Sequence, residues 1–289
     1  MVARIAAKGM LNFLSDENYL KIVYWARMGR KLNLSSPKRY TEKIQWLKLN
    51  NRKPEYTIMV DKYLVKKYVA DIIGEEYIIP TLGVWDRFED IDFSSLPQQF
   101  VLKCTHDSGG LVICKDKKIL DIEQAKVKIN KSLSKNYYKA GREWPYKDVK
   151  PRIIAETYME DNEDGELRDY KFFAFDGEVK ALFIATDRGR KDTETKFDFF
   201  DENFNHLEFT NGHPNSDILP HKPKNFEKMK QLAAILSKGI PHARIDFYEV
   251  DEKVLFGEIT FSHWSGMVPF EPDKWDYNFG EWINIKQLQ

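Results

Sequence analysis

Residues 100–113, FVLKCTHDSGGLVI, are the most informative part of the chain for its fold. Lys103 lies inside an apolar run, and a polar loop with two glycines and a second apolar run follow it. This pattern predicts two strands joined by a glycine-containing loop. A buried-strand lysine needs an anionic partner, and backbone N–H groups of such a loop can close over phosphates. The alternative, an edge-strand lysine beside an ordinary turn, stays open for this stretch alone.

A second hairpin is predicted near the C-terminus, from residues 243–250 and 254–261 with a turn at 251–253. Side chains alternate between the two faces of a strand, so Asp246 and Glu258 can point the same way from neighbouring strands. Two carboxylates on one face repel unless a cation or a proton lies between them, and Mg²⁺ prefers such oxygen ligands. Equally, one carboxylate could face solvent or pair with Arg244.

Two further segments carry candidate binding residues. The apolar strand at 152–158 runs into a polar segment, an arrangement typical of a hinge whose backbone bonds an adenine edge, although an ordinary strand end fits as well. The strand at 169–175 carries Lys171, which could reach phosphates or pair with Asp169. An Asp-Gly turn at 176–177 predicts that this strand begins a hairpin.

The remaining pattern alternates helices and short strands. Helical periodicity, apolar β-rich runs and turn residues predict helices within 10–50 and at 61–73, 122–139 and 226–238, and strands at 77–80, 179–186, 196–200 and 207–209. Hairpins mixed with helices indicate an α+β protein with mostly antiparallel sheets. The chain contains neither G-x-G-x-x-G after its first strand nor G-x-x-x-x-G-K-[ST], which argues against Rossmann and P-loop architectures.

Composition narrows the class of protein. The 289 residues include 45 Lys+Arg and 45 Asp+Glu, and this zero net charge argues against a nucleic-acid partner. No apolar run approaches the roughly 20 residues of a membrane-spanning helix. Cys104 and Cys114 are too few for a disulfide framework, so free thiols in a cytoplasmic protein, at or near the inner face of the membrane, are expected.

Taken in order, these segments resemble the ATP-grasp superfamily. The resemblance begins at residues 61–69, DKYLVKKYV, and at 74–80. More closely, the chain is similar to the TupA-like ATP-grasp family of bacterial surface-polysaccharide and teichuronopeptide synthesis. Further support comes from four segments, NLSSPKRYTEKIQWL at 33–47, EWPYK at 143–147, PRIIAE at 151–156 and DYKFF at 169–173. The resemblance covers about residues 30–285.

The resemblance implies an ATP-grasp fold, in which two lobes of mostly antiparallel sheet with flanking helices hold ATP between them. It places an N-terminal helical segment at 1–58, an N-lobe with the phosphate loop at 59–155, and a C-lobe with the metal site at 156–289.

The resemblance also implies roles for individual residues. Catalysis would rest on Lys103, Lys171, Arg188 and Arg244. Nucleotide binding would use Lys103, Lys171 and a second lysine, Lys62 or Lys66, together with the loop residues Thr105, His106, Ser108, Gly109 and Gly110 and the hinge residues Glu156, Thr157, Tyr158 and Met159. Mg²⁺ would bind Asp246, Glu258 and Thr260, although Thr260 stands where many ATP-grasp enzymes have Asn.

The implied activity is an ATP-dependent carboxylate–amine ligase with an acyl-phosphate intermediate. The family context implies a uronic acid of a surface polysaccharide or its precursor as acceptor and an amine or amino acid as donor. Arg188, Arg190 and Lys191 are candidates for binding the acidic acceptor. Alternatives are a kinase of the same fold acting on a sugar or glycan, a glycosyltransferase, and a non-catalytic glycan-binding protein of polysaccharide assembly.

Overall fold

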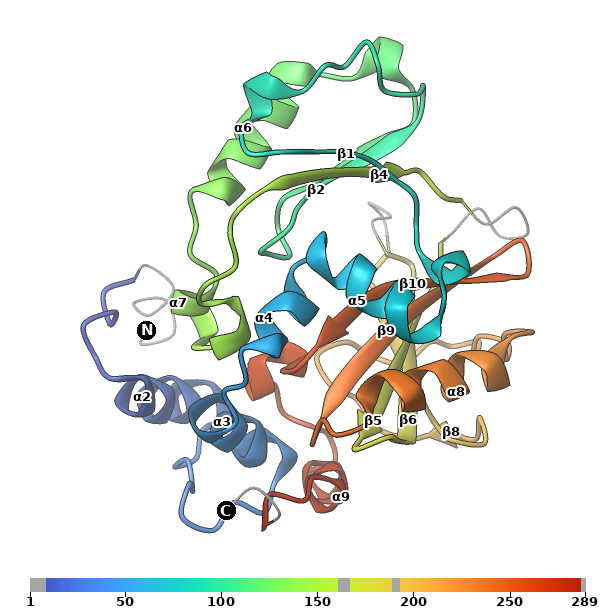
Figure 1. Cartoon of the computed structure of the whole chain (residues 1–289). Helices are drawn as coiled ribbons and strands as arrows, with labels where there is room; N and C mark the ends of the chain where they lie inside the picture. The colour runs from blue at the N-terminus through green and yellow to red at the C-terminus, as the bar shows by residue number, and fades with distance from the viewer. Residues whose placement is uncertain (1–8, 161–166, 189–192, 287–289) are drawn as a thin grey trace.

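Two antiparallel β-sheets and the helices packed against them form the protein (Figure 1). The computed structural model describes residues 9–160, 167–188 and 193–286. The smaller sheet has the strand order β1-β4-β2-β3 and the larger sheet the order β10-β9-β5-β6-β7-β8. The α+β prediction with mostly antiparallel sheets is therefore confirmed.

The smaller sheet lies at the top of Figure 1 and is packed against helix α6. Its strands are β1 (Thr81–Trp85), β2 (Phe100–Cys104), β3 (Leu111–Cys114) and β4 (Ile153–Thr157), and α6 spans Ile122–Leu133. The predicted strand at 77–80 is wrong, because β1 begins only after Pro80. Proline has no N–H to donate to a β-ladder, so a strand starts beyond it. The single helix predicted at 122–139 ends at Leu133, and the short helix α7 (Tyr138–Gly141) follows.

The larger sheet is covered by helices on both faces. Its strands are β5 (Asp169–Phe175), β6 (Glu178–Thr186), β7 (Lys196–Asp201), β8 (His206–Leu207), β9 (Ala243–Val250) and β10 (Lys253–Thr260). Helices α4 (Glu55–Val60), α5 (Leu64–Ile73) and α8 (Phe226–Ser237) pack in the apolar core that contains Phe172. Helices α3 (Tyr40–Asn50) and α9 (Lys274–Trp282) pack in the core that contains Phe173. Neighbouring residues of one strand thus fill cores on opposite faces.

Two tight turns set the register of the larger sheet. Asp176 and Gly177 join β5 to β6, and Asp251 and Glu252 join β9 to β10; all four have positive φ, as a type I′ turn requires. The Asp-Gly turn was predicted correctly. The second turn has two residues and not the three predicted at 251–253, since Lys253 already pairs with Val250.

The N-terminal part adds a smaller helical layer. Helix α2 (Asp16–Met28) begins after Ser15, whose hydroxyl accepts the Asn18 N–H, and ends at Gly29 in the left-handed conformation.

The described residues also contain short 3-10 helices: η1 (Glu75–Tyr77), η2 (Phe88–Asp90), η3 (Lys117–Ile119), η4 (Trp144–Tyr146) and η5 (His263–Gly266). No helix within the described residues is long and apolar enough to cross a membrane.

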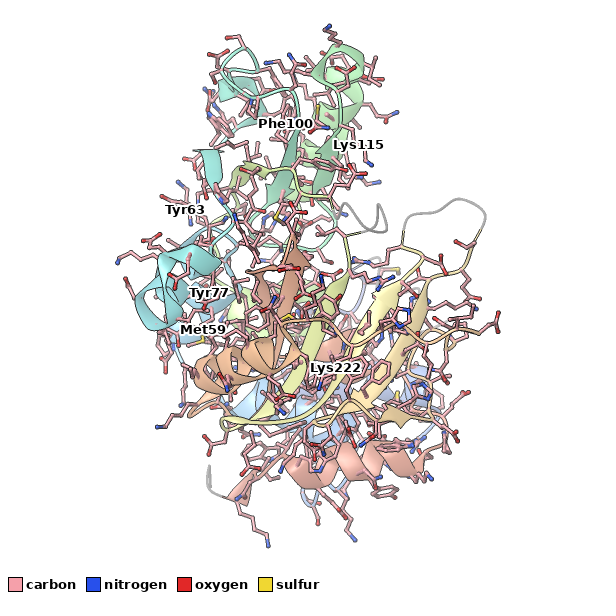
Figure 2. All side chains as sticks on the ribbon, turned by 90° about the vertical axis from the view of Figure 1, so that its right-hand side faces the viewer. Met59, Tyr63, Tyr77, Phe100, Lys115 and Lys222 are labelled. Atoms are coloured by element: carbon pink, nitrogen blue, oxygen red, sulfur yellow. The ribbon has the colours of Figure 1, made fainter. Side chains whose placement is uncertain are left out.

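Two features of the structure can be compared with the predicted lobe boundaries. The boundary between residues 155 and 156 falls inside β4. Helix α5, assigned by sequence to the N-lobe, packs against α8 and the larger sheet. In Figure 2, Phe100 and Lys115 mark the smaller lobe at the top, Met59 and Tyr77 lie beside the larger lobe, and Tyr63 lies between them.

Candidate active site

A cavity between the two sheets is lined by charged side chains from both. Lys103 and Glu156 reach it from the smaller sheet, and Lys171, Asp246 and Glu258 reach it from the larger sheet. The start of α5 and the segment before it add Lys62 and Lys66. The predicted convergence of the strand lysine and the two hairpin acids on one cavity is thus what the structure shows.

Three charged residues form one row across the larger sheet. Lys171 of β5 lies opposite Asp246 of β9, and Asp246 lies opposite Glu258 of β10. A bulge at Gly257 is needed for this row, since regular pairing continued past Phe256 would put Gly257 opposite Asp246 and turn Glu258 to the other face. A side chain at Gly257 would begin 3.0 Å from the Asp246 carbonyl oxygen, so glycine fits the close approach of the strands.

Asp246 is buried and held by two cations. The Arg244 guanidinium donates through Nε to Oδ1 and through Nη2 to Oδ2, both at 2.7 Å, and the Lys171 ammonium also contacts Oδ2. Arg244 donates through Nη1 to His263 Nδ1 at 2.9 Å. Burial, together with Arg244, lowers the pKa of His263 well below its usual value, so the ring is neutral and can accept this bond.

Glu258 lies at the open end of this row, with its side chain 38% exposed. Its Oε1 accepts from Arg244 Nη2 at 2.8 Å and from the Thr260 hydroxyl at 3.2 Å. Burial alone would raise the pKa of Glu258, but the charges of Arg244, Lys62 and Lys171 outweigh it and lower the pKa to about 2. The group is therefore a carboxylate at neutral pH, as a metal ligand must be.

A second group of charged residues lies on the wall of the cavity opposite this row. It consists of Lys103, Glu156 and Lys66. Glu156 Oε2 lies 2.5 Å from Lys103 Nζ, and Oε1 lies 2.5 Å from Lys66 Nζ. The strand register makes Lys103 and Glu156 diagonal neighbours on one face of the smaller sheet. Burial lowers the pKa of Lys66, an effect that the charge of Glu156 opposes.

The glycine loop between β2 and β3 is tied to its surroundings through Asp107. Asp107 Oδ1 accepts the Gly110 N–H at 3.1 Å, and Oδ2 accepts the Ser132 hydroxyl of α6. Lys62 Nζ donates to the Asp107 carbonyl oxygen at 2.5 Å. Thr105 and His106 are buried and turn away from the cavity, because Thr105 bonds the backbone at 150–152 and His106 bonds the Ser132 carbonyl oxygen.

A second, less polar cavity adjoins the first and shares six lining residues with it: Lys103, Leu111, Glu156, Asp169, Arg188 and Tyr248. Its remaining wall combines the apolar Val101, Ile113, Met159 and Leu167 with the hinge residues Thr157 and Tyr158 and the charged Lys115 and Glu160. This arrangement of an apolar pocket beside a row of cations suits a flat base joined to a chain of phosphates.

Most of the predicted site residues line these two cavities. They are Lys62, Lys66, Lys103, Ser108, Gly110, Glu156, Thr157, Tyr158, Met159, Lys171, Arg188, Asp246 and Glu258. The structure does not place Thr105, His106, Gly109, Arg244 or Thr260 in either lining. Arg190 and Lys191 lie outside the described residues.

The charged and hydroxyl-bearing lining residues that were not predicted as site residues are Asp107, Asp169, Tyr248, Lys115 and Glu160. Asp169 is buried beside the ammonium of Lys171 at 3.3 Å and also pairs with Arg188. Tyr248 lies opposite Asp169 in the sheet. The alternation of side chains along a strand could have identified Asp169 and Tyr248. Each lies two residues from a predicted site residue, and therefore on the same face of its strand.

The described side chains supply only some of the ligands that a magnesium ion needs. Among the described residues no cluster of three or more His, Cys, Asp or Glu side chains is placed to hold a metal. Asp246 and Glu258 supply two neighbouring carboxylates, which matches an ion that takes its other ligands from phosphates and water. The Thr260 hydroxyl bonds Glu258 and Arg244, so it contacts the carboxylate and not the cavity.

Comparison with known proteins identifies the family. The model of the family described as TupA-like ATPgrasp matches residues 42–284. The chain therefore belongs to the TupA-like ATP-grasp family, and both the resemblance and the fold class that it implied are confirmed. No curated protein matches the sequence.

Solved structures give only remote likenesses. D-alanine–D-alanine ligase from Bacillus anthracis, complexed with ATP, is 16% identical over 71% of this chain and 55% of its own, with a TM-score of 0.44. The ATP-grasp ligase PsnB, complexed with minimal precursor, Mg and ADP, is 11% identical over 90% and 66%, with a TM-score of 0.41. An L-amino acid ligase from Bacillus licheniformis is 13% identical over 86% and 53%, with a TM-score of 0.44. The chain thus spans little more than half the length of two of these three.

Proposed function

We propose that this protein is an ATP-dependent ligase that joins a carboxylate to an amine. One observation carries the proposal: a lysine of the smaller sheet and two carboxylates of the larger sheet line one cavity, which continues into an apolar pocket. Membership of the TupA-like ATP-grasp family supports it. ATP would lie between the sheets, with adenine in the apolar pocket and the triphosphate toward Asp246 and Glu258.

Each charged group has a role in this arrangement. Lys62, Lys103 and Lys171 bind phosphate oxygens, and Asp246 and Glu258 hold Mg²⁺, which neutralises charge on the phosphates when bound. Arg244 does not line the cavity; it orients the Asp246 carboxylate and adds positive charge near the transferring phosphoryl group.

The chemistry follows from the class of ligase. The acceptor carboxylate attacks the γ-phosphorus of ATP, ADP leaves, and an acyl phosphate forms. The amine then attacks the acyl carbon, the C–O bond to phosphate breaks, and an amide and inorganic phosphate result. Positioning and charge neutralisation are what the protein contributes to both steps.

The acceptor we propose is a uronic-acid carboxylate of a surface polysaccharide or its precursor, and the donor is an amino acid or another amine. Arg188 supports this choice, because its half-exposed guanidinium stands at the junction of the two cavities, where it can meet an acidic group. The reaction would take place in the cytoplasm, at or near the inner face of the membrane, where ATP is available.

Isotope transfer tests the proposal. A uronic-acid-containing glycan labelled with ¹⁸O in its carboxyl group is incubated with the protein, Mg-ATP and a mixture of amino acids. The ligase reaction transfers one ¹⁸O to inorganic phosphate for each amide formed, and phosphate release depends on the amine. A phosphorylated glycan that forms without any amine would make the protein a kinase. Glycan binding with no ATP turnover would make it a binding protein.

A further inference from the structure

Glu156 was predicted to lie in the adenine hinge, and in the structure it lines both cavities. The side chain is 6% exposed, and each of its two oxygens lies 2.5 Å from a different ammonium group, that of Lys66 or Lys103. Both lysines line the cavity that also holds Asp246 and Glu258. The geometry therefore ties the Glu156 carboxylate to two cations that line the first cavity.

The two lysines come from parts of the protein that pack differently. Lys103 lies on β2 of the smaller sheet, whereas Lys66 lies on α5, which packs against the larger sheet. Lys66 Nζ also donates to the Ile79 carbonyl oxygen at 2.6 Å. Among the described residues, Glu156 is the only recorded hydrogen-bond or ion-pair partner of the Lys103 ammonium. An ammonium group has three N–H donors, so donors on both lysines stay available to a ligand.

We propose that Glu156 is a positioning residue for the phosphates of the nucleotide: its carboxylate holds Lys66 and Lys103 side by side, with their remaining N–H groups directed at the triphosphate. The proposal rests on the proposed function, since it takes ATP as the ligand of the cavity. It also makes Lys66, together with Lys62, a phosphate-binding lysine.

Burial explains why the two lysines need this carboxylate. Lys66 and Lys103 are 12% and 23% exposed, and two such ammonium groups repel each other unless an anion lies between them. Burial lowers the pKa of Lys66 and the charge of Lys103 lowers it further, while Glu156 raises it. The other charged groups that face this cavity are Lys62, Asp107, Asp169, Lys171, Arg188, Asp246 and Glu258. Without Glu156, Lys66 would keep its proton only at lower pH.

Simple charge counting predicts the opposite effect of removing Glu156. A carboxylate beside a triphosphate repels it, so Glu156→Gln would strengthen ATP binding if both lysines stayed charged and in place. If Glu156 positions them, the same variant weakens ATP binding. A third possibility, that the carboxylate accepts the adenine amino group, predicts a change in the preference for ATP over GTP. The three hypotheses thus predict different results for Glu156→Gln: tighter ATP binding, weaker ATP binding, or a changed preference for ATP over GTP.

The experiment titrates Mg-ATP and Mg-GTP into the whole protein by calorimetry between pH 6.5 and 9.5. For Glu156→Gln we expect about tenfold weaker ATP binding at pH 8, a loss of binding that begins about one pH unit lower than in wild type, and an unchanged ATP/GTP ratio. The control is Glu89→Gln, which removes one carboxylate of the same lobe from an exposed pair with Lys126 and should change none of these.

Lys66→Met is the second variant, because it leaves Glu156 paired one to one with Lys103 and so keeps the buried charges balanced. It should weaken ATP binding at every pH without changing base preference. ATP binding that is unchanged or tighter in Glu156→Gln, a loss of preference for ATP over GTP, or full-strength binding in Lys66→Met would each overturn the proposal. Failure of the wild-type protein to bind ATP would instead overturn the proposed function.

Discussion

Replacing Asp246 with Asn is expected to destabilise the protein as well as inactivate it. Asp246 is 1% exposed and is the shared partner of the Arg244 guanidinium and the Lys171 ammonium, each of which is 10% exposed. An amide keeps the shape of the side chain but removes the charge. Both cations then remain buried with less compensation, although Lys171 retains Asp169 and Arg244 retains Glu258.

The size of the destabilisation follows from the two buried cations, Arg244 and Lys171, that lose a charged partner. Breaking a buried ion pair by removing one partner costs about 3–5 kcal/mol. At about 2–4 °C per kcal/mol for a domain of this size class, the melting temperature should fall by roughly 10 °C. Hydrolysis of ATP should fall below detection, because the same carboxylate is the proposed ligand of Mg²⁺.

Asp198→Asn provides the matched control. Asp198 is fully buried in the same sheet, but its hydrogen bonds come from neutral donors, the Ser216 N–H at 2.9 Å and the Ser216 hydroxyl at 2.6 Å; His206 Nε2 lies 4.0 Å from its Oδ1. Loss of part of this bonding should cost about 1–3 kcal/mol. Both variants are unfolded by heat and by urea, with circular dichroism as the readout. An Asp246→Asn protein that is no less stable than Asp198→Asn would refute the view that Asp246 compensates two buried cations.

Two further variants test the site. Lys103→Met should weaken ATP binding tenfold or more with little loss of stability, because its ammonium is partly exposed; calorimetry would show unchanged affinity if the lysine does not meet the nucleotide. Glu258→Gln should flatten the acid side of the stability profile: the pKa of Glu258 is lowered to about 2, so its charge stabilises the fold above the ordinary glutamate pKa of about 4.3, and this contribution is lost as the pH falls toward 2. Urea unfolding between pH 5 and 2.5 measures this, and equal slopes for variant and wild type would contradict it.

Local signals in the sequence were sufficient for most of the sheet structure. Alternating apolar residues and the turn at Asp176 and Gly177 predicted the β5–β6 hairpin, and the pattern around Lys103 predicted β2 and β3. Three of the α-helices and strands were not predicted correctly. The strand predicted at 77–80 ends where β1 and its pairing with β4 begin, and helices α4 and α9 were not predicted at all. Helix α9 is held by aromatic packing of Phe279 against Tyr40 and Phe173, contacts that only the folded chain brings together.

The site was predictable where it follows strand alternation and not where it depends on register. Asp246 and Glu258 were expected on one face, and they are, but through a two-residue turn and a bulge at Gly257 in place of a three-residue turn. Glu156 is an example of a contact that the sequence could not predict. Its position at a strand end suggested adenine contact, while its partner Lys66 lies on a helix that packs against the opposite sheet. Such a pairing depends on tertiary structure and has no local signature.

A crystal structure of the protein with Mg²⁺ and a non-hydrolysable ATP analogue would show whether the nucleotide binds between the two sheets. We expect adenine against the apolar wall near Met159, phosphate oxygens within hydrogen-bonding distance of Lys103, and Mg²⁺ bound by Asp246 and Glu258. A nucleotide bound away from the cavity between the sheets, or a triphosphate with its metal on other residues, would contradict this expectation.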